Sequence, residues 1–284
     1  MNDTTMSQQE TLSDTKRALL ERLRQGRGLS DIIPRLSEQA ARRASFGQER
    51  LWFMQQLAPN SVAYSMHQAL RIDGVLNMEL LAQAFQQLIA SHDVLQHGFR
   101  NENGQLFMHA VMPAQLELLD LSTLAAEHQE LALAEHAQAH AASSFNLEHG
   151  PLLRLTAVRL SSQRHALLFA IHHIISDEWS NTLFWKELGT VYTALSQARP
   201  IPNTATLQYA DYAAWQRQQL SELHSNRQLD YWRAMLAGPL PSLNLPIDHQ
   251  RPAVQSYHGA IARHMLSPQR TQACLLYTSD AADE

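Results

Sequence analysis

The sequence predicts a mixed α/β domain, of the α/β or α+β class, in which strands and helices alternate without a fixed order. Two kinds of pattern support this class. Apolar runs of strand length lie at 152–160 and 166–171, and helical spacing of apolar residues recurs elsewhere in the chain. The 284 residues are enough to bury a sizeable core, and the net charge of -5 argues against a nucleic-acid partner.

The first half of the predicted domain begins with a capped helix. Ser45 stands three residues before Gln48, which is the spacing of a capping box, and Pro59 marks the end of the helix. The elements that follow are a strand over 62–73, a helix capped by Asn77 with Leu81, Phe85 and Leu88 on one face, and strands at 99–100 and 106–111 joined through the turn residues Asn103 and Gly104.

The second half continues the alternation. An alanine-rich helix is expected over 124–143, and the apolar runs at 152–160 and 166–171 form a hairpin. Ser176 is expected to cap the next helix. The remaining predicted features are the apolar stripe Phe184, Leu188, Tyr192 and Leu195 on that helix, two helices over 210–223 and 228–236, and an extended linker over 239–252.

The two ends of the chain differ from the body. Residues 1–43 form a polar leader with a short helix, and a docking element for an upstream subunit is one interpretation of it. Residues 274–284 resemble the in-frame translation of a sequencing adaptor, so the native sequence is expected to end near Ala273. The leader lacks the apolar stretch of a signal peptide, which predicts a cytoplasmic protein with no membrane partner.

The strongest chemical signal lies between an apolar strand and a helix. His172, His173 and Asp177 fall together there, and a neutral imidazole at such a junction can accept a proton near neutral pH. Spacing alone leaves three interpretations open: catalysis, a structural histidine with acidic residues at a helix start, or a metal site. Adjacent strand histidines point to opposite faces, which weakens the metal interpretation.

Four segments then carry a family resemblance. Residues 171–180 resemble the His-His-x-x-x-Asp-Gly motif of condensation domains from nonribosomal peptide synthetases. The other segments, in the family's order, are 45–57 with Gln48, Arg50, Leu51 and Trp52, then 91–99, and 209–215 with Tyr209, Asp211 and Trp215. The chain from 44 to 267 is therefore similar to this family over most of its length.

The resemblance implies a chloramphenicol-acetyltransferase-like fold of two lobes, with the active site between them. It places the N-terminal lobe at 44–205 and the start of the second lobe and a linker at 206–273. The resemblance also implies that donor and acceptor groups arrive on 4'-phosphopantetheine arms of peptidyl or acyl carrier domains, next to an adenylation domain. No directly bound cofactor and no metal are expected.

Site residues follow from the same resemblance. His173 matches the second motif histidine, which in the family either removes a proton from the acceptor amine or orients it. The expected supporting residues are His172, Ser176, Asp177, Glu178 and Trp179. The expected structural motif residues are Gln48, Arg50, Trp52, Tyr209, Asp211 and Trp215. Tyr209 and Trp215 are expected to pack rather than to bind a ligand.

Two departures from the family pattern bear on activity. Glu178 replaces the motif glycine, and Gln96 replaces the arginine that usually pairs with the motif aspartate. The chain also stops near the start of the second lobe, so we expect it to be inactive alone. The alternatives are a related epimerisation or free-standing acyltransferase domain, and a non-catalytic carrier-docking domain.

Overall fold

The computed structural model describes residues 33–37, 39–201, 207–220, 222–250, 252–253, 262 and 264–280. The leader helix expected before residue 24 lies outside these residues. The chain divides into two compact units, 1–241 and 242–284, and each is described by itself. The lobe boundary expected at 205/206 stays a prediction.

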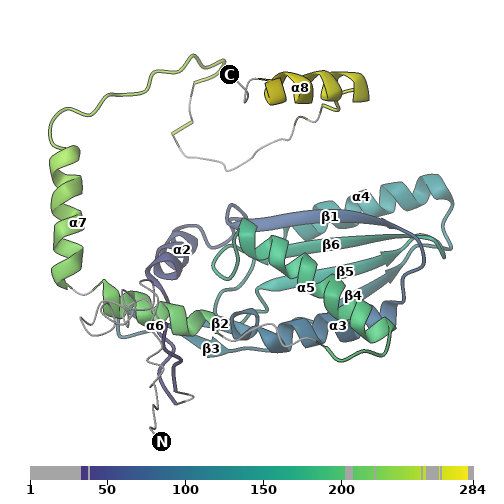
Figure 1. The fold of residues 1–284 in the computed structure, drawn as a ribbon, viewed down its shortest axis with the longest axis horizontal. Coiled ribbons are helices and arrows are strands. Elements are labelled where there is room, and N and C mark those ends of the chain that lie inside the picture. Colours follow the sequence, from purple (N-terminus) through teal and green to yellow (C-terminus); the bar gives the residue numbers. More distant parts are fainter. Residues whose placement is uncertain are drawn as a thin grey trace, which may run out of the picture. The chain divides into compact units, whose positions relative to one another are not determined.

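A mixed four-stranded sheet forms the centre of the first unit (Figure 1). Its strands are β1 (Ser65–Asp73), β6 (Arg164–His172), β5 (Leu153–Arg159) and β4 (Leu116–Asp120), in the spatial order β1-β6-β5-β4. The β4–β5 pair is parallel and the other pairs are antiparallel, so the predicted mixed sheet and the β5–β6 hairpin are confirmed. β1 begins at Ser65 rather than at 62, because a turn in which Ser65 donates to the Val62 carbonyl precedes it.

A separate hairpin pairs β2 (His97–Glu102) with β3 (Gln105–Ala110). Its turn holds Asn103 at φ 53° and Gly104 at φ 81°. Asparagine and glycine tolerate this left-handed region better than other residues, and the Asn-Gly signal in the sequence is therefore confirmed.

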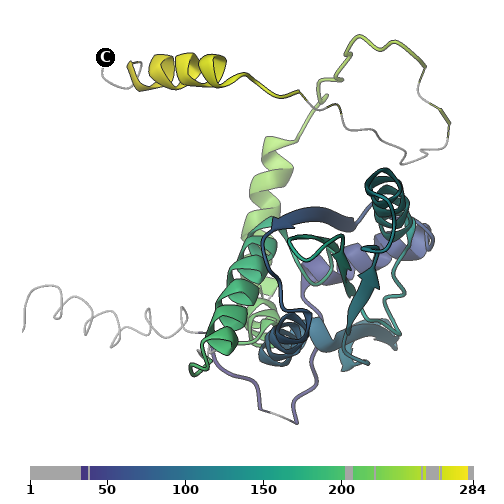
Figure 2. The same cartoon turned by 90° about the vertical axis from the view of Figure 1, so that its right-hand side faces the viewer.

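Helices cover both faces of the sheet (Figure 2). On one face, α3 (Met78–Ser91) packs beside α5 (Glu178–Ser196); on the other lies α4 (Ala126–Ala142). Side chains alternate along each strand, so β6 contributes Phe169 to the core beneath α3 and α5 and Leu168 to the core beneath α4. The predicted helix cap at Asn77 is confirmed, since its side chain accepts from two backbone N–H groups.

Four further elements complete the first unit. They are α2 (Phe46–Leu57), the short 3-10 helix η1 (Asp93–Gln96), α6 (Tyr209–Gln219) and α7 (Glu222–Met235). Ser45 caps α2 through the predicted capping box with Gln48. Ala210 and Ala213 of α6 are buried in the same core as residues of α3 and α5.

The second unit contains α8 (Pro268–Asp280), where no helix was expected. The Ser267 side chain accepts from the Arg270 backbone N–H at 3.4 Å, which is the geometry of a helix start. The adaptor origin expected for 274–284 stays a prediction. Within the described part of the chain, no helix is long and apolar enough to cross a bilayer.

Candidate active site

The histidine motif lies where β6 ends and α5 begins, and its two imidazoles have different surroundings. His172 is the last residue of β6 and is 1% exposed. His173 is exposed, and its backbone N–H donates to the Tyr64 carbonyl at 2.7 Å. This bond fixes the start of the loop to the segment that leads into β1. The motif therefore presents one imidazole to solvent and keeps the other in the core.

A backbone hydrogen bond sets the tautomer of His173. Nδ1 lies 2.7 Å from the Ser176 carbonyl oxygen, which can only accept, so Nδ1 carries the proton. In the neutral ring Nε2 then holds a lone pair that can accept a proton. Ser176 is fixed in turn by its hydroxyl, which donates to Asn181 Oδ1 at 2.9 Å, and Asn181 is 2% exposed.

His172 supports the loop from below. Its Nδ1 accepts from the Ile174 backbone N–H at 3.1 Å, and its Nε2 lies 3.4 Å from Gln55 Oε1. Phe145 packs edge-on against the ring. Burial, with a smaller contribution from neighbouring His173, lowers the pKa of His172 to about 4. His172 is therefore neutral at physiological pH, where it accepts the Ile174 N–H.

Asp177, and not Ser176, caps α5, so the predicted cap was wrong by one residue. The Asp177 carboxylate accepts from the Ser180 backbone N–H at 2.8 Å and from the Ser180 hydroxyl at 2.6 Å. The same two bonds lower the pKa of Asp177 below its ordinary value and keep it ionised. Gln96 donates to the Ile89 carbonyl at 3.0 Å, so Asp177 is held by Ser180 instead of by the residue at the family's arginine position.

Glu178 and Trp179 face away from the site. Both are exposed, Trp179 by 75%, and neither lines the pocket beside His173. The glutamate at the motif glycine position therefore adds its charge to the helix surface and not to the pocket.

The pocket beside His173 has a volume of about 450 Å³. Its walls come from α2, the α3–η1 junction, the loop after β6, one face of α5 and the start of α6. Aliphatic residues and polar residues each make up nine of the twenty residues that line it. Ligand pockets combine apolar surface with hydrogen-bonding groups in this way.

Gln48 connects α2 to the motif loop. It is 2% exposed, and its amide donates to the Ile174 carbonyl at 3.2 Å while its oxygen accepts from the Ser45 backbone N–H at 3.0 Å. The Ser45 hydroxyl also lies 3.0 Å from the Tyr209 hydroxyl. Tyr209 lines the pocket as well as packing on Tyr212, a position that the sequence did not predict.

The other expected motif residues lie outside the pocket. Arg50 is exposed on α2, and Trp52 packs half-buried against the core. Trp215 lies in ring contact with Tyr212. Asp211 is 6% exposed, and its carboxylate accepts from the backbone N–H groups of Gln208 and Leu36, both at 2.8 Å.

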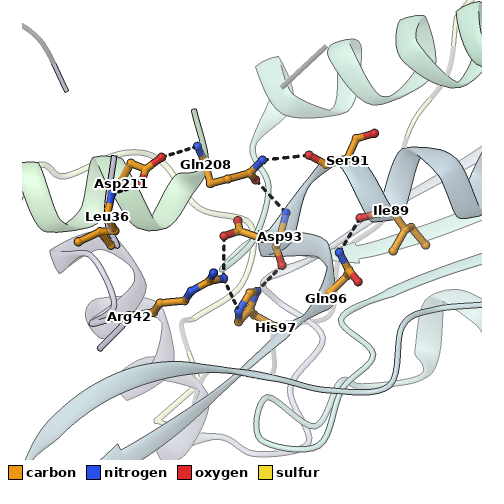
Figure 3. Close-up of polar contacts among 9 residues, drawn as sticks. All are labelled: Leu36, Arg42, Ile89, Ser91, Asp93, Gln96, His97, Gln208 and Asp211. Carbon is orange, nitrogen blue, oxygen red and sulfur yellow. Dashed lines mark hydrogen bonds and ion pairs between the residues drawn. The ribbon is translucent and has the colours of Figure 1, made fainter. Parts of the chain in front are cut away.

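A polar network fastens the start of α6 to the α3–η1 junction (Figure 3). The Gln208 side chain accepts from the Asp93 backbone N–H at 2.9 Å and donates to the Ser91 carbonyl at 3.1 Å. Arg42 reaches the same junction and bonds Asp93 Oδ2 at 2.9 Å and His97 Nε2 at 3.1 Å. This network holds one wall of the pocket.

Sequence reasoning missed a second polar pair in the pocket. His92 Nε2 lies 2.6 Å from Glu187 Oε2, and both side chains line the pocket. His92 lies in segment 91–99, one of the four that carry the family resemblance, and Glu187 lies on the same face of α5 as Phe184. Neither feature of the sequence predicts that these two side chains, 95 positions apart, form a hydrogen bond.

Metal binding was one open interpretation of the motif. His172 bonds toward Gln55 in the core, and His173 bonds toward Ser176 at the surface. Among the residues that the structure describes, no three His, Cys, Asp or Glu side chains gather closely enough to hold a metal ion.

In a comparison with curated proteins, this chain is similar to short parts of long peptide synthases. The chain is 41% identical over 220 residues to one of the linear gramicidin synthase proteins of Brevibacillus parabrevis, a match that covers 76% of this chain and 3% of that protein. It is 31% identical over 229 residues to surfactin synthase subunit 2 of Bacillus subtilis, a match that covers 81% of this chain and 6% of that protein. The chain thus spans a small part of these relatives' length.

Comparison with solved structures finds the same kind of domain. The first condensation domain of the calcium-dependent antibiotic synthetase, in complex with a substrate analogue, matches with a TM-score of 0.61 and 25% identity, over 69% of this chain and 47% of that chain. The starter condensation domain of rhizomide synthetase shares the fold with a TM-score of 0.62 at 24% identity, over 68% of this chain and 47% of that one. The chain therefore has the chloramphenicol-acetyltransferase-like fold of these domains and spans about half of their length.

The family model for the condensation domain matches residues 38–280. That range contains all four sequence motifs, the mixed sheet and the pocket beside His173. The chain therefore belongs to the condensation domain family.

Proposed function

We propose that this chain supplies the histidine-bearing half of a nonribosomal peptide synthetase condensation domain. In the reaction, a carrier-bound acceptor amine attacks a carrier-bound donor thioester and an amide bond forms. The observation that carries the proposal is the His173 ring, which lines the pocket with Nδ1 bonded to Ser176 and a lone pair on Nε2.

The chemistry asks little of the protein beyond position and proton handling. The amine nitrogen attacks the thioester carbonyl carbon, the carbon–sulfur bond breaks, and the thiol leaves with one proton from the amine. His173 Nε2 accepts that proton or orients the amine by accepting a hydrogen bond from it. Direct transfer requires no serine or cysteine nucleophile.

Carrier domains bearing 4'-phosphopantetheine are the proposed partners, with an adjacent adenylation domain. The support is the likeness to the linear gramicidin and surfactin synthases. Because the chain spans about half of the solved condensation domains, we propose that residues 1–284 alone do not form the amide bond. The cytoplasmic location expected from the sequence stays a prediction.

A domain completed with the downstream half of a relative tests the proposal. Residues 1–273 would be joined to the corresponding half of a linear gramicidin synthase condensation domain and given carrier proteins loaded with donor and acceptor. We expect amide formation, measured by mass spectrometry, to fall about 10²- to 10⁴-fold in His173→Ala. His136→Ala, an exposed histidine on α4, is the matched control. An unchanged rate in His173→Ala would instead favour a docking role or another base.

A further inference from the structure

The pocket beside His173 extends along α5. Four residues of that helix line it, namely Ser180, Leu183, Phe184 and Glu187, and their spacing places them on one face. Glu187 follows Ser180 by seven positions in the helix, which is about 10 Å at the α-helical rise. The pocket therefore begins beside the motif loop and reaches about two helical turns away from it.

Along the α5 face, the lining changes from polar to apolar and then to acidic. Near the motif loop lie His173, Asp177 and Ser180, and at the far end lies the pair of His92 and Glu187. Along α5, Leu183 and Phe184 lie between Ser180 and Glu187, and Leu88 and Val94 add further apolar side chains to the lining. A ligand that fits has a polar head, an apolar stem and a polar end.

The lining holds two carboxylates and two histidines, and one of these, His92, bonds the Glu187 carboxylate. Asp177 and Glu187 contribute carboxylates, and among the described residues that line the pocket there is no lysine or arginine. A half-buried carboxylate at the end of an apolar channel favours a cationic partner. The Glu187 side chain is 18% exposed, so solvent screens it less than a surface carboxylate.

The far end is held in place from two sides. His92 lies between Ser91 and Asp93, and the Gln208 side chain bonds the backbone of both neighbours (Figure 3). The His92 ring in turn bonds Glu187 across the pocket at 2.6 Å. His92 and Gln208 are therefore positioning residues for the Glu187 carboxylate.

We propose that this pocket receives the side chain of the acceptor amino acid, and that Glu187 selects a long aliphatic side chain ending in a cation, of the lysine type. The inference rests on the proposed function, because it is the acceptor amine that meets His173 there. Lysine combines a flexible apolar stem with a terminal ammonium group, which matches the order of apolar and acidic groups along α5.

Binding to the full chain tests this without requiring catalysis. The probes are N-acetylcysteamine thioesters of lysine and of 2-aminoheptanoic acid, which has a methyl group in place of the ammonium group. By titration calorimetry at low salt we expect the lysyl thioester to bind about tenfold more tightly, which corresponds to ~1.4 kcal/mol. Added salt should reduce this preference.

Two variants test whether the preference for the lysyl thioester comes from Glu187. In Glu187→Gln the two thioesters should bind within about twofold of each other. Glu135→Gln, which removes an exposed carboxylate on α4, should keep the tenfold preference. Circular dichroism would check that each variant is folded. If Glu187→Gln does not fold, the salt dependence of binding to the unmodified chain still tests whether the preference for the lysyl thioester is electrostatic.

The outcomes separate this inference from the proposed function. Equal or tighter binding of the 2-aminoheptanoyl thioester, binding of neither, or a preference that survives Glu187→Gln would overturn the subsite. If the completed domain then still forms amide bonds, the proposed function stands without it. A lysyl preference that disappears in Glu187→Gln and persists in His173→Ala supports the subsite, even where no amide forms.

Discussion

The two faces of the central sheet are built from the same strands and serve different purposes. Beneath α4, Leu121, Leu133 and Leu168 are buried together in a small core. Beneath α3 and α5 the core is larger, and it opens at the end of β6 into the pocket beside His173. The position of the candidate site is therefore set by the end of β6, where the buried core gives way to the pocket that holds His173.

Charged groups follow the same division. On the α4 side, partial burial together with the nearby Arg154 guanidinium lowers the pKa of both His67 and His140. Arg154 also lies 4.0 Å over the Phe145 ring. His67 is exposed on this face, His140 and Arg154 are partly buried, and none of the three lines the pocket beside His173.

The largest expected effect is on stability, when a cavity is created in the core on either face of the sheet. Phe169 and Leu168 are consecutive on β6, are at most 2% exposed and point to opposite faces. We expect Phe169→Ala to lower the free energy of unfolding by ~3–5 kcal/mol and Leu168→Ala by ~2–5 kcal/mol, measured by urea denaturation.

Binding of a thioester in the pocket should distinguish Phe169→Ala from Leu168→Ala. Phe169 packs on Phe184 with ring centres 4.9 Å apart, so its loss should also weaken thioester binding in the pocket. Leu168→Ala should leave that binding unchanged in conditions where the protein is folded. Equal effects of the two variants on binding would contradict the assignment of the pocket to the α3–α5 face of the sheet.

The next effect concerns pH. The pKa of His172 is about 4 in the folded chain and about 6.5 when unfolded, so below 6.5 the unfolded state binds a proton that the folded state does not. Stability is therefore full above 6.5 and falls between 6.5 and 4, by an amount on the order of 3 kcal/mol.

His172→Asn checks this pH dependence, because its amide oxygen can accept from the Ile174 N–H without titrating. Urea unfolding of both proteins across this pH range should show a smaller loss in the variant. Histidines 67, 97, 140 and 165 also have lowered pKa values, so part of the pH dependence should remain. Identical pH profiles would contradict the role assigned to His172.

The helix cap gives a smaller effect. Asp177→Ala removes the bonds to Ser180 and should lower stability by ~1 kcal/mol, while Asp177→Asn keeps an acceptor and should lower it less. Thermal unfolding measures the difference. If the alanine and asparagine variants unfold alike, the capping role of Asp177 is wrong.

The smallest effect is expected at the motif glycine position. Glu178→Gly restores the family residue on an exposed helix start, so amide formation in a completed domain should change less than about twofold. Stability should fall by at most ~1 kcal/mol, because glycine is a poor helix former. A large gain in rate would place Glu178 in the reaction after all.

Local chemistry explains which parts of this fold could be predicted from sequence. Ser45, Asn77 and the Asn103–Gly104 turn act through bonds or backbone angles within a few residues, and all three were predicted correctly. Ser176 and Asp177 are both good caps, and the choice between them depended on Asn181, which takes the Ser176 hydroxyl.

The pocket depended on contacts between distant residues. His92 and Glu187 meet across 95 residues, and Gln208 reaches the α3–η1 junction across more than 100. Periodicity places each of these residues on an element but does not say which elements touch. The motif therefore predicted where His173 lies, and the structure was needed to identify what lies beside it.

The tautomer of His173 tests the central claim most directly. Two-dimensional nitrogen-15 NMR of the full chain with labelled histidine, assigned with His173→Ala, reports which ring nitrogen is protonated in the neutral form. We predict a proton on Nδ1 and a lone pair on Nε2. A neutral ring protonated on Nε2 would contradict the account, because that nitrogen could then accept no proton from an amine.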